Sequence, residues 1–403
     1  MKNKILKVLF GTFMLFILVI VTNVGFQEIY SLPDNFVASY DEIVLSNRVK
    51  KFGTLISTDI EKEIFKTGAK QEEYDYIVFK LFNLIPIRKV KIKLAPEEDV
   101  YVGGVPIGLE LLTNGAIFVG ESAVECENGL NITSKTEKFR KGDMIYQVDG
   151  KDIKTINDIK NIVNNSENED IEVKFLRKNK EMKSIIKRAK DKEENLKLGL
   201  LVKDDVSGIG TLTYVNTKTG KFGAVGHAIT ESENLVNVLG GKVYVCNIFG
   251  VQKGEKNNPG QLKGVFLQNS GEKGKVESNN KYGVFGVIDD KTDLVDENIL
   301  SKIGGRLSVS PGKAKIVSSV SGIREEYDIE IIKASYQSKA NEKSIVFRVL
   351  DKRLLNLTGG IVQGMSGSPI IQNGKLVGAV THVFTSDPTK GYGVYSDWMV
   401  LNS

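Results

Sequence analysis

The chain has 403 residues, of which 41% are hydrophobic and 26% are charged, a balance typical of a globular protein with two or three domains. Its net charge of +5 comes from Lys and Arg spread along the chain without interleaved aromatic residues, so no nucleic-acid partner is expected. The chain has two histidines and lacks the His-Glu-x-x-His and Cys-x-x-Cys motifs, which disfavours a metal site. We expect no cofactor, and we expect Cys126 and Cys246, in different predicted domains, to be free.

The N-terminus carries the pattern of an export signal or membrane anchor. Lys2, Lys4 and Lys7 precede an apolar run from Val8 to about Val24, and no convincing small-x-small cleavage site follows it. Residues 1–26 are therefore predicted to be an uncleaved or slowly cleaved anchor. Because the lysines should stay cytoplasmic, the rest of the chain is expected to be exported and membrane-associated.

Residues 27–96 form an N-terminal region to which no chemistry can be assigned. Short apolar segments alternate with charged stretches, and residues 90–94 alternate strictly between apolar and basic residues. That alternation predicts a β-strand just before the next domain.

Residues 97–187 resemble a PDZ domain, an α+β fold. The segment from Lys141 to Ile153 resembles the Gly-Asp-x-Ile-x-x-Val-Asp-Gly signature of bacterial PDZ domains. Residues 157–163 have helical spacing, and residues 171–176 suit a closing strand. A peptide or a protein C-terminus is expected to bind as an added strand beside Ile107, Gly108 and Leu109.

A charge-rich linker is predicted at residues 188–197, and an all-β domain at residues 198–403. The second region contains about a dozen short apolar or alternating segments separated by Gly, Asn-Gly and Asp-rich turns. The whole chain is therefore predicted to be mainly β.

The motif Gly364-Met365-Ser366-Gly367-Ser368-Pro369 is typical of a serine nucleophile on a tight turn. Glycine at 364 would let the N–H groups of Gly364 and Ser366 point into one oxyanion hole. Apolar segments on both sides of Asn373-Gly374 predict a hairpin after the turn. This arrangement resembles chymotrypsin-like serine peptidases and implies their double β-barrel. Ser368 is the alternative nucleophile, in a position that usually holds a small spacer.

A serine nucleophile needs a base, and chymotrypsin-like chains place it upstream. His227 is the one histidine there, flanked by small residues in Gly226-His227-Ala228. The residues alone leave the orienting acid open. Aspartates at 289, 290, 293, 296, 328 and 351 all precede Ser366, and the Asp289-Asp290 pair and Asp351 are equally suitable.

Beyond these motifs, nearly the whole chain after the anchor resembles the SpoIVB-type PDZ-containing serine peptidases of endospore-forming bacteria. The most specific stretch runs from Gly359 to Val383, with further support from Gly208 to Thr213, Gly226 to Ile229 and Tyr282 to Gly286. The resemblance implies a triad of His227, Asp351 and Ser366, and so selects Asp351 as the acid. Thr381, His382 and Val383 fall where a chymotrypsin-like strand pairs with substrate, and His382 is equally compatible with a structural role.

The resemblance implies a sporulation signalling endopeptidase exported across the inner forespore membrane into the space between the forespore membranes. Its substrate would be an inhibitory membrane-protein complex whose cleavage triggers intramembrane processing of pro-sigma-K, and it would also cleave itself. Two alternatives remain open: a membrane-tethered PDZ adaptor with an inactive peptidase fold, and an HtrA-like quality-control protease.

Overall fold

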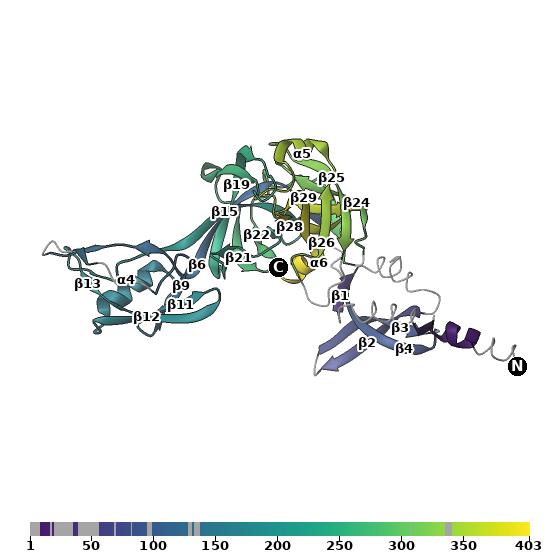
Figure 1. Cartoon of the computed structure of the whole chain (residues 1–403), viewed down its shortest axis with the longest axis horizontal. Coiled ribbons are helices and arrows are strands. Elements are labelled where there is room, and N and C mark those ends of the chain that lie inside the picture. Colours follow the sequence, from purple (N-terminus) through teal and green to yellow (C-terminus); the bar gives the residue numbers. More distant parts are fainter. Residues whose placement is uncertain are drawn as a thin grey trace.

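The computed structural model describes residues 9–16, 18–19, 35–38, 56–67, 70–81, 83–94, 99–127, 131–132, 138–306, 308–334 and 341–403. Strands dominate these residues, and the few helices are short. The prediction of a mainly β chain is therefore confirmed (Figure 1). Among the described residues, no helix is both long and apolar enough to cross a membrane. Most of the predicted anchor lies outside the described residues.

An N-terminal sheet of four strands has the order β1-β4-β3-β2. It consists of β1 (Asn35–Ala38), β2 (Ile56–Thr67), β3 (Lys70–Leu81) and β4 (Ile85–Leu94). The strand predicted at residues 90–94 is the second half of β4, where Val90 is buried and the basic residues beside it are not. This strict alternation is typical of a sheet with one solvated face.

Most other strands belong to one closed barrel-like sheet. Its first part contains β5 (Asp99–Val102), β6 (Pro106–Glu121), β9 (Met144–Val148), β10 (Lys151–Asp152), β11 (Asp170–Arg177), β12 (Lys180–Lys187), β15 (Leu200–Asn216), β16 (Lys221–Ala224), β19 (Val238–Gln252) and β20 (Gln261–Phe266). Its second part contains β21 (Gly274–Asn280), β22 (Gly283–Ile288), β23 (Leu300–Ile303), β24 (Gly312–Ser318), β25 (Glu325–Ala334), β26 (Ile345–Val349), β27 (Pro369–Gln372), β28 (Lys375–Phe384) and β29 (Asp387–Tyr395).

The remaining elements are short and complete the chain. Among the described residues, the helices α4 (Ile156–Asn165), α5 (Lys352–Thr358) and α6 (Ser396–Leu401) accompany the 3-10 turn η1 (Gln268–Ser270), and residues 9–16 are also helical. Small two-stranded ladders are formed by β7 (Val124–Glu125) with β8 (Asn131–Ile132), β13 (Ala189–Lys190) with β14 (Leu196–Lys197), and β17 (Thr230–Glu231) with β18 (Asn234–Leu235).

Two separate hydrophobic cores lie within residues 198–403 and the strands that pair with them. One is built on β24 to β29 with α5 and α6, and includes Phe347, Met365 and Tyr395. The other is built on β15, β16 and β22, and includes Leu212 and Phe222. Two separate clusters of buried apolar side chains are the arrangement expected if the strands form two packed barrels, each with its own core.

A third core lies in the unit formed by β9, β11, β12 and α4, at the left of Figure 1. The predicted helix and closing strand are found here as α4 and β11. Two long strands, β6 and β15, run from this unit into the central barrel and are shared by both. In β6, Leu109 belongs to the second core and Phe118 to the third.

The boundary between these units therefore falls inside β6 and β15. The segment predicted as a linker at residues 188–197 instead carries β13 and β14, and Leu198 right after it is buried in the third core. The first half of β6, predicted as part of the PDZ domain, belongs to the second core. Both cysteines, Cys126 and Cys246, are buried and free, as predicted.

The pair of Arg306 and Asp397 lies fully inside the first core. Arg306 Nε donates to Asp397 Oδ2 at 2.6 Å, and both side chains are at most 1% exposed. The guanidinium also stacks 3.7 Å from the centre of the Trp398 ring. Burial raises the pKa of Asp397, and Arg306 counteracts that rise.

Replacing Arg306→Met should therefore lower the free energy of unfolding by about 3–5 kcal/mol, because it leaves Asp397 buried without its cation. The double variant Arg306→Met/Asp397→Leu should recover most of that loss. Chemical denaturation of the single and double variants measures both values. Equal losses in the two variants would contradict this account of the pair.

Candidate active site

The nucleophile motif forms a tight turn between Gln363 and β27. Gly364 and Gly367 both have a φ of 98°, a backbone conformation that glycine adopts without strain. A Cβ at Gly367 would lie 2.0 Å from the carbonyl oxygen of Thr211 and 2.4 Å from the nitrogen of Val225. Glycine is therefore required at position 367 for the turn to pack against β15.

Two threonines of β15 hold this turn. Thr211 Oγ1 donates to the carbonyl of Gly364 at 2.8 Å, and Thr213 Oγ1 donates to the carbonyl of Gly367 at 2.8 Å. The backbone N–H of Thr211 also donates to the carbonyl of Ser366 at 2.9 Å. With three carbonyls of the turn fixed, its N–H groups are directed to the other side.

The predicted oxyanion hole agrees with these hydrogen bonds. Met365 N donates to Val362 O and Gly367 N donates to Val380 O. Within the part of the chain that the structure describes, the N–H groups of Gly364 and Ser366 have no such partner. Two uncommitted backbone donors on either side of one residue are what an oxyanion requires.

His227 follows β16 through a strained segment. Val225 and Gly226 have φ values of 68° and 74°, and a positive φ is unusual for a β-branched residue such as Val225. A Cβ on Gly226 would lie 3.2 Å from both Thr381 Cγ2 and Val380 O. The backbone just before His227 therefore packs directly against β28. Strained backbone of this kind is often found at functional sites.

A backbone carbonyl sets the tautomer of His227. Its Nδ1 lies 2.8 Å from the carbonyl of Ala228, so Nδ1 carries the proton and Nε2 is left as the basic nitrogen. Burial lowers the pKa of His227, while the Ala228 carbonyl and Glu342 raise it. A largely neutral imidazole at neutral pH is the state that a general base needs.

Ser366 is not yet bonded to this base. Its Oγ donates to the carbonyl of Thr381 at 2.9 Å. Ser366 and His227 line the same cavity, of about 720 Å³, but the structure contains no hydrogen bond between them. For His227 to act as the base for Ser366, Ser366 Oγ would have to rotate away from Thr381 toward His227.

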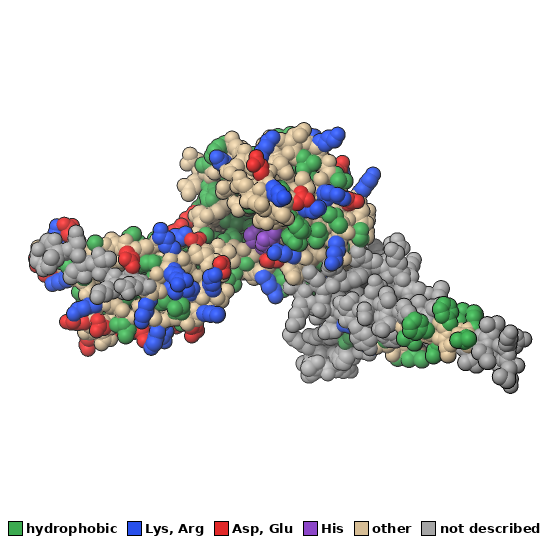
Figure 2. All heavy atoms as spheres, in the orientation of Figure 1, with side chains coloured by type: hydrophobic (Ala, Val, Ile, Leu, Met, Phe, Trp, Pro, Cys, Tyr) green, Lys and Arg blue, Asp and Glu red, His purple; other side chains and the backbone are tan. Residues whose placement is uncertain are grey.

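The residues predicted to bind substrate line the same cavity. Thr381, His382 and Val383 surround it together with Gly364 and the backbone of residues 206–209. Figure 2 shows the two histidine side chains grouped beside a hollow in the surface. Their ring centres are 4.9 Å apart. Burial, His227 and Lys343 lower the pKa of His382 to about 4, so it is neutral at neutral pH.

Asp351 does not lie at this cavity, so its predicted role as the triad acid is not supported. Its side chain caps α5 by accepting from Arg353 N at 2.8 Å, and it forms an ion pair with Arg353 Nη2 at 2.8 Å. This pair lowers the pKa of Asp351. The physical reason is the direction of β26. Its five residues span about 13 Å and carry the chain from the cavity at Glu342 to the far end of the barrel.

The other acid considered from the sequence, the Asp289-Asp290 pair, does not line the cavity either. Asp290 forms an ion pair with Lys273 at 2.5 Å. Of the described residues that line the cavity, Glu342 alone carries a carboxylate. Glu342 could not be selected from the sequence, because it precedes a strand without any motif around it and the acid was expected to be an aspartate.

The peptide groove expected beside Ile107, Gly108 and Leu109 is not present, and that prediction is wrong. These residues pair with β15 on one side, where Gly108 opposes Ile209, and with β19 on the other, where Gly108 opposes Tyr244. A strand whose two edges are both paired cannot accept a further strand. Gly108 is also covered by the ring of Phe266, 2.5 Å from where a Cβ would be.

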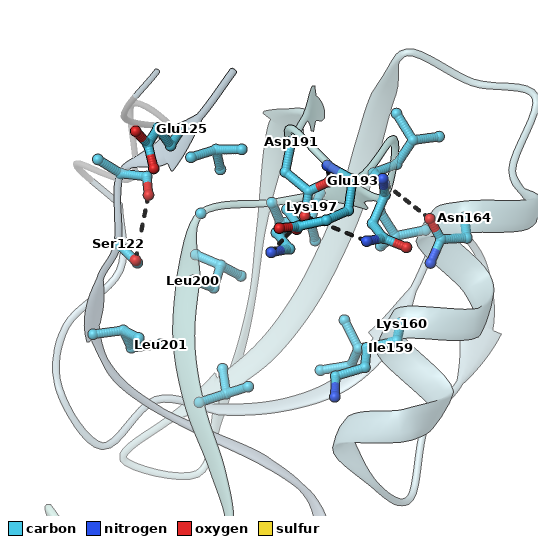
Figure 3. Close-up of a pocket in the computed structure, with 18 of the residues that line it drawn as sticks. Ser122, Glu125, Ile159, Lys160, Asn164, Asp191, Glu193, Lys197, Leu200 and Leu201 are labelled. Atoms are coloured by element: carbon cyan, nitrogen blue, oxygen red, sulfur yellow. Dashed lines mark hydrogen bonds and ion pairs between the residues drawn. The ribbon is translucent and has the colours of Figure 1, made fainter. Parts of the chain in front are cut away.

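An open strand edge lies instead at the start of β15. Residues 200–203 pair with β6 on one side, and within the described structure no strand pairs with their other edge. That edge faces α4 across a cavity of about 730 Å³ (Figure 3). Ile159 and Lys160 of α4 line one wall, and Leu200 and Leu201 of β15 line the other.

The loop that leads into this edge has a glycine between two apolar residues, as Ile107-Gly108-Leu109 also does. Gly199 has a φ of 68° and lies between Leu198 and Leu200. Leu196 N donates to Asn164 Oδ1 at 2.9 Å, which ties the loop to the C-terminal part of α4. A groove between a helix and a free strand edge is the geometry of strand addition.

No described residues form a metal centre: no group of three or more His, Cys, Asp or Glu side chains in these ranges is placed to hold an ion. The comparisons with known proteins agree with the peptidase geometry. A family model described as SpoIVB peptidase S55 matches residues 194–400, just over half of the chain. No curated protein matches the chain.

Replacing Thr211→Val should lower kcat at least about tenfold with a smaller change in KM, because the turn that presents Ser366 loses one of its hydrogen bonds. The loss in folding stability should be only about 1 kcal/mol. Thr217→Val is the matched control, since Thr217 Oγ1 bonds the carbonyl of Asp99 at 2.9 Å, away from the turn. Equal activity losses in the two variants, measured by steady-state peptide cleavage, would contradict a specific role for Thr211.

Proposed function

The chain belongs to the SpoIVB peptidase S55 family, and from this premise we propose that its peptide-bond hydrolysis uses Ser366 as nucleophile and His227 as general base. Members of the family are serine peptidases, and the family suggests a role in sporulation. The observation that supports this assignment best is the Thr-held turn that presents Ser366 in one cavity with His227.

The geometry supports an acyl-enzyme mechanism. Ser366 Oγ attacks the carbonyl carbon of the scissile peptide bond, and its proton passes to His227 Nε2. The carbonyl oxygen becomes an oxyanion held by the N–H groups of Gly364 and Ser366. The C–N bond then breaks, and His227 returns the proton to the leaving amine. Water, activated by the same imidazole, releases the acyl group from Ser366.

Ser368 does not suit the role of nucleophile. Its side chain is fully buried, its Oγ has no hydrogen-bond partner in the described structure, and it does not line the cavity. A buried hydroxyl cannot reach a peptide substrate. Ser368 N donates to Met365 O, so this residue instead closes the turn.

The wider role that we propose is signalling by limited proteolysis outside the cytoplasm. The apolar run after Lys2, Lys4 and Lys7 supports export and attachment to the membrane. Within the SpoIVB framework, the substrate would be the extracytoplasmic part of an inhibitory membrane complex between the forespore membranes. Its cleavage would free an intramembrane metalloprotease to process pro-sigma-K, and the enzyme would also cleave itself.

The groove between α4 and β15 would bind the partner of this reaction as an extended apolar peptide. The free edge of residues 200–203 supplies backbone donors and acceptors, and Ile159, Leu200 and Val202 supply an apolar lining. Charged side chains of both signs also line the groove, and Lys197 is paired with Asp191 at 2.6 Å, which leaves Lys160 as a candidate partner for a carboxylate on the peptide. Two alternative functions make different predictions. A membrane-tethered PDZ adaptor with an inactive peptidase fold would use only this groove. An HtrA-like quality-control protease would degrade many unfolded chains.

Ser366→Ala should abolish cleavage of an internally quenched peptide library and self-cleavage of the full chain, since no other residue supplies the nucleophile. Ser368→Ala should keep activity within about threefold, apart from a modest loss of stability. Loss of labelling by a fluorophosphonate in Ser366→Ala provides an independent measurement. Full activity in Ser366→Ala would reject the mechanism, and a folded but inactive wild type would favour the adaptor.

Leu201→Asp should weaken binding of apolar peptides to the inactive Ser366→Ala chain at least about tenfold, because it places a charge beside the open edge of β15. Ile185→Asp is the matched control, an exposed apolar residue of β12 outside the groove. Fluorescence anisotropy with peptides bearing free or amidated C-termini measures the affinities and tests for carboxylate recognition. Equal affinities for the two variants would place the peptide elsewhere.

A further inference from the structure

The hairpin that directly follows His227 contacts two other parts of the molecule. It spans residues 229–236 and contains β17 and β18. Its base lines the catalytic cavity through Ile229. Its tip is a two-residue turn in which Ser232 and Glu233 have φ values of 48° and 68°. Because the hairpin and His227 are adjacent in the chain, the contacts that fix the hairpin also limit where the imidazole can lie.

Asn279 of β21 holds the base of this hairpin. Its Oδ1 accepts from Ile229 N at 2.9 Å, and its Nδ2 donates to the carbonyls of Ile229 at 2.9 Å and Val236 at 2.8 Å. Ile229 O also accepts from Val236 N at 3.1 Å. Asn279 is only 9% exposed, so its hydrogen bonds are shielded from water. They fix the backbone two residues after His227.

Asn234 of β18 fastens the tip of the hairpin to the third-core unit, which consists of β9, β11, β12 and α4 with the loops between them. Its Nδ2 donates to the carbonyl of Gly142 at 2.6 Å, and its Oδ1 accepts from Asn179 N at 3.0 Å. Gly142 lies just before β9, and Asn179 lies in the turn between β11 and β12. Asn234 is 2% exposed. Its amide therefore joins two loops of this unit to the hairpin of the general base.

Apolar packing reinforces this junction. One buried cluster contains Ile117 of β6, Met144 of β9, Val206 of β15 and Val236 of the hairpin, and Ile229 packs against it. The cluster thus includes residues from the third-core unit, from the hairpin and from the two strands that run between the units. Buried apolar contacts beside buried hydrogen bonds indicate a fixed junction between the two parts of the chain.

The Gly142-Asp143 pair of the predicted PDZ signature forms the receiving side of the junction. Gly142 has a φ of 87°, and a Cβ there would lie 2.1 Å from both Cβ and Oγ of Ser232. Asp143 accepts from Arg177 Nε at 2.8 Å and from Arg177 Nη2 at 2.6 Å. This ion pair joins the loop before β9 to the end of β11. The two loops that bind Asn234 are therefore held together before they meet the hairpin.

We propose that Asn234 and Asn279 are positioning residues for His227, and that the third-core unit supports the general base through Asn234. Neither asparagine lines the catalytic cavity, and no described residue of β9, β11, β12 or α4 lines it either. Both asparagines act on the backbone that follows His227, Asn279 at the base of the hairpin and Asn234 at its tip. A small displacement of a base costs much of its activity, because proton transfer depends on its distance from the nucleophile.

Asn234→Ala should lower the rate at which a fluorophosphonate labels Ser366 in the full chain at least about fivefold. The kcat for an internally quenched peptide should fall by the same factor, with KM within about twofold. Ile171→Val is the matched control, since it trims a fully buried side chain of the third core at the opposite end of β11 from Asn179. Its labelling rate should stay within about twofold of the wild type. Unchanged labelling in Asn234→Ala, or equal losses in both variants, would overturn the proposal.

Gly142→Ala tests the junction from its other side, and it remains informative if Asn234→Ala does not fold. The added Cβ meets Ser232, so the labelling rate should fall. Gly142→Ala/Ser232→Gly should recover at least about threefold, because glycine at position 232 removes the contacted atoms and tolerates a φ of 48°. The strain of alanine at a φ of 87° is present in both variants and cannot cause a recovery. The absence of recovery would contradict support across the junction.

The inference rests on the proposed role of His227, and NMR of the inactive Ser366→Ala chain separates the two. The chain has two histidines, so His382→Asn assigns both imidazole C–H signals. Asn234→Ala should shift or broaden the signal of His227, and Ile171→Val should leave it in place. An unmoved His227 signal would reject the inference alone. A moved signal, together with continued cleavage by Ser366→Ala, would reject the proposed function and keep the support of the segment that carries His227.

Discussion

The hydrogen bonds from Thr211 and Thr213 to the turn around Ser366 are the constraint on which the site depends. They join a strand of the second core to a turn that follows α5 in the first core. The same strand also fixes the base, because Val225 N, two residues before His227, donates to Thr211 O at 3.1 Å. One short stretch of β15 thus fixes the backbone beside both Ser366 and His227, the two residues proposed to react.

Local signals in the sequence predicted the turn around Ser366 and the hairpin that follows it. The Gly364-to-Pro369 motif specifies a turn that needs positive φ at two positions, and the structure has both. Asn373 and Gly374 have φ values of 52° and 75°, and they join β27 to β28 as the predicted hairpin. His227 could be selected because few histidines compete for the role. Each of these features is encoded within about ten neighbouring residues, which is the range over which patterns are reliable.

The predictions that the structure does not support all depended on contacts between distant segments. Ile107 to Leu109 look like an open edge until β19, more than a hundred residues later, pairs with them. In the sequence, Asp351 is a strand-end acid near Ser366. In the structure, β26 leads away from the cavity, and Asp351 at its end caps α5. Glu342 lines the cavity because β26, which it precedes, pairs with β29, and β29 pairs with β28. Sequence spacing contains none of this pairing.

The continuity of β6 and β15 gives the third core a particular place in the topology. Leu112 of β6 opposes Asp205 of β15. The chain therefore leaves the barrel along β6 and returns to it along β15, which is paired with β6. Residues 113–204 are thus the elaborated tip of a single β-hairpin, and joining 112 to 205 through a tight turn would leave the barrel ladder complete. The groove between α4 and β15 therefore belongs to an insertion within this hairpin, and the remainder of the same hairpin holds the turn around Ser366.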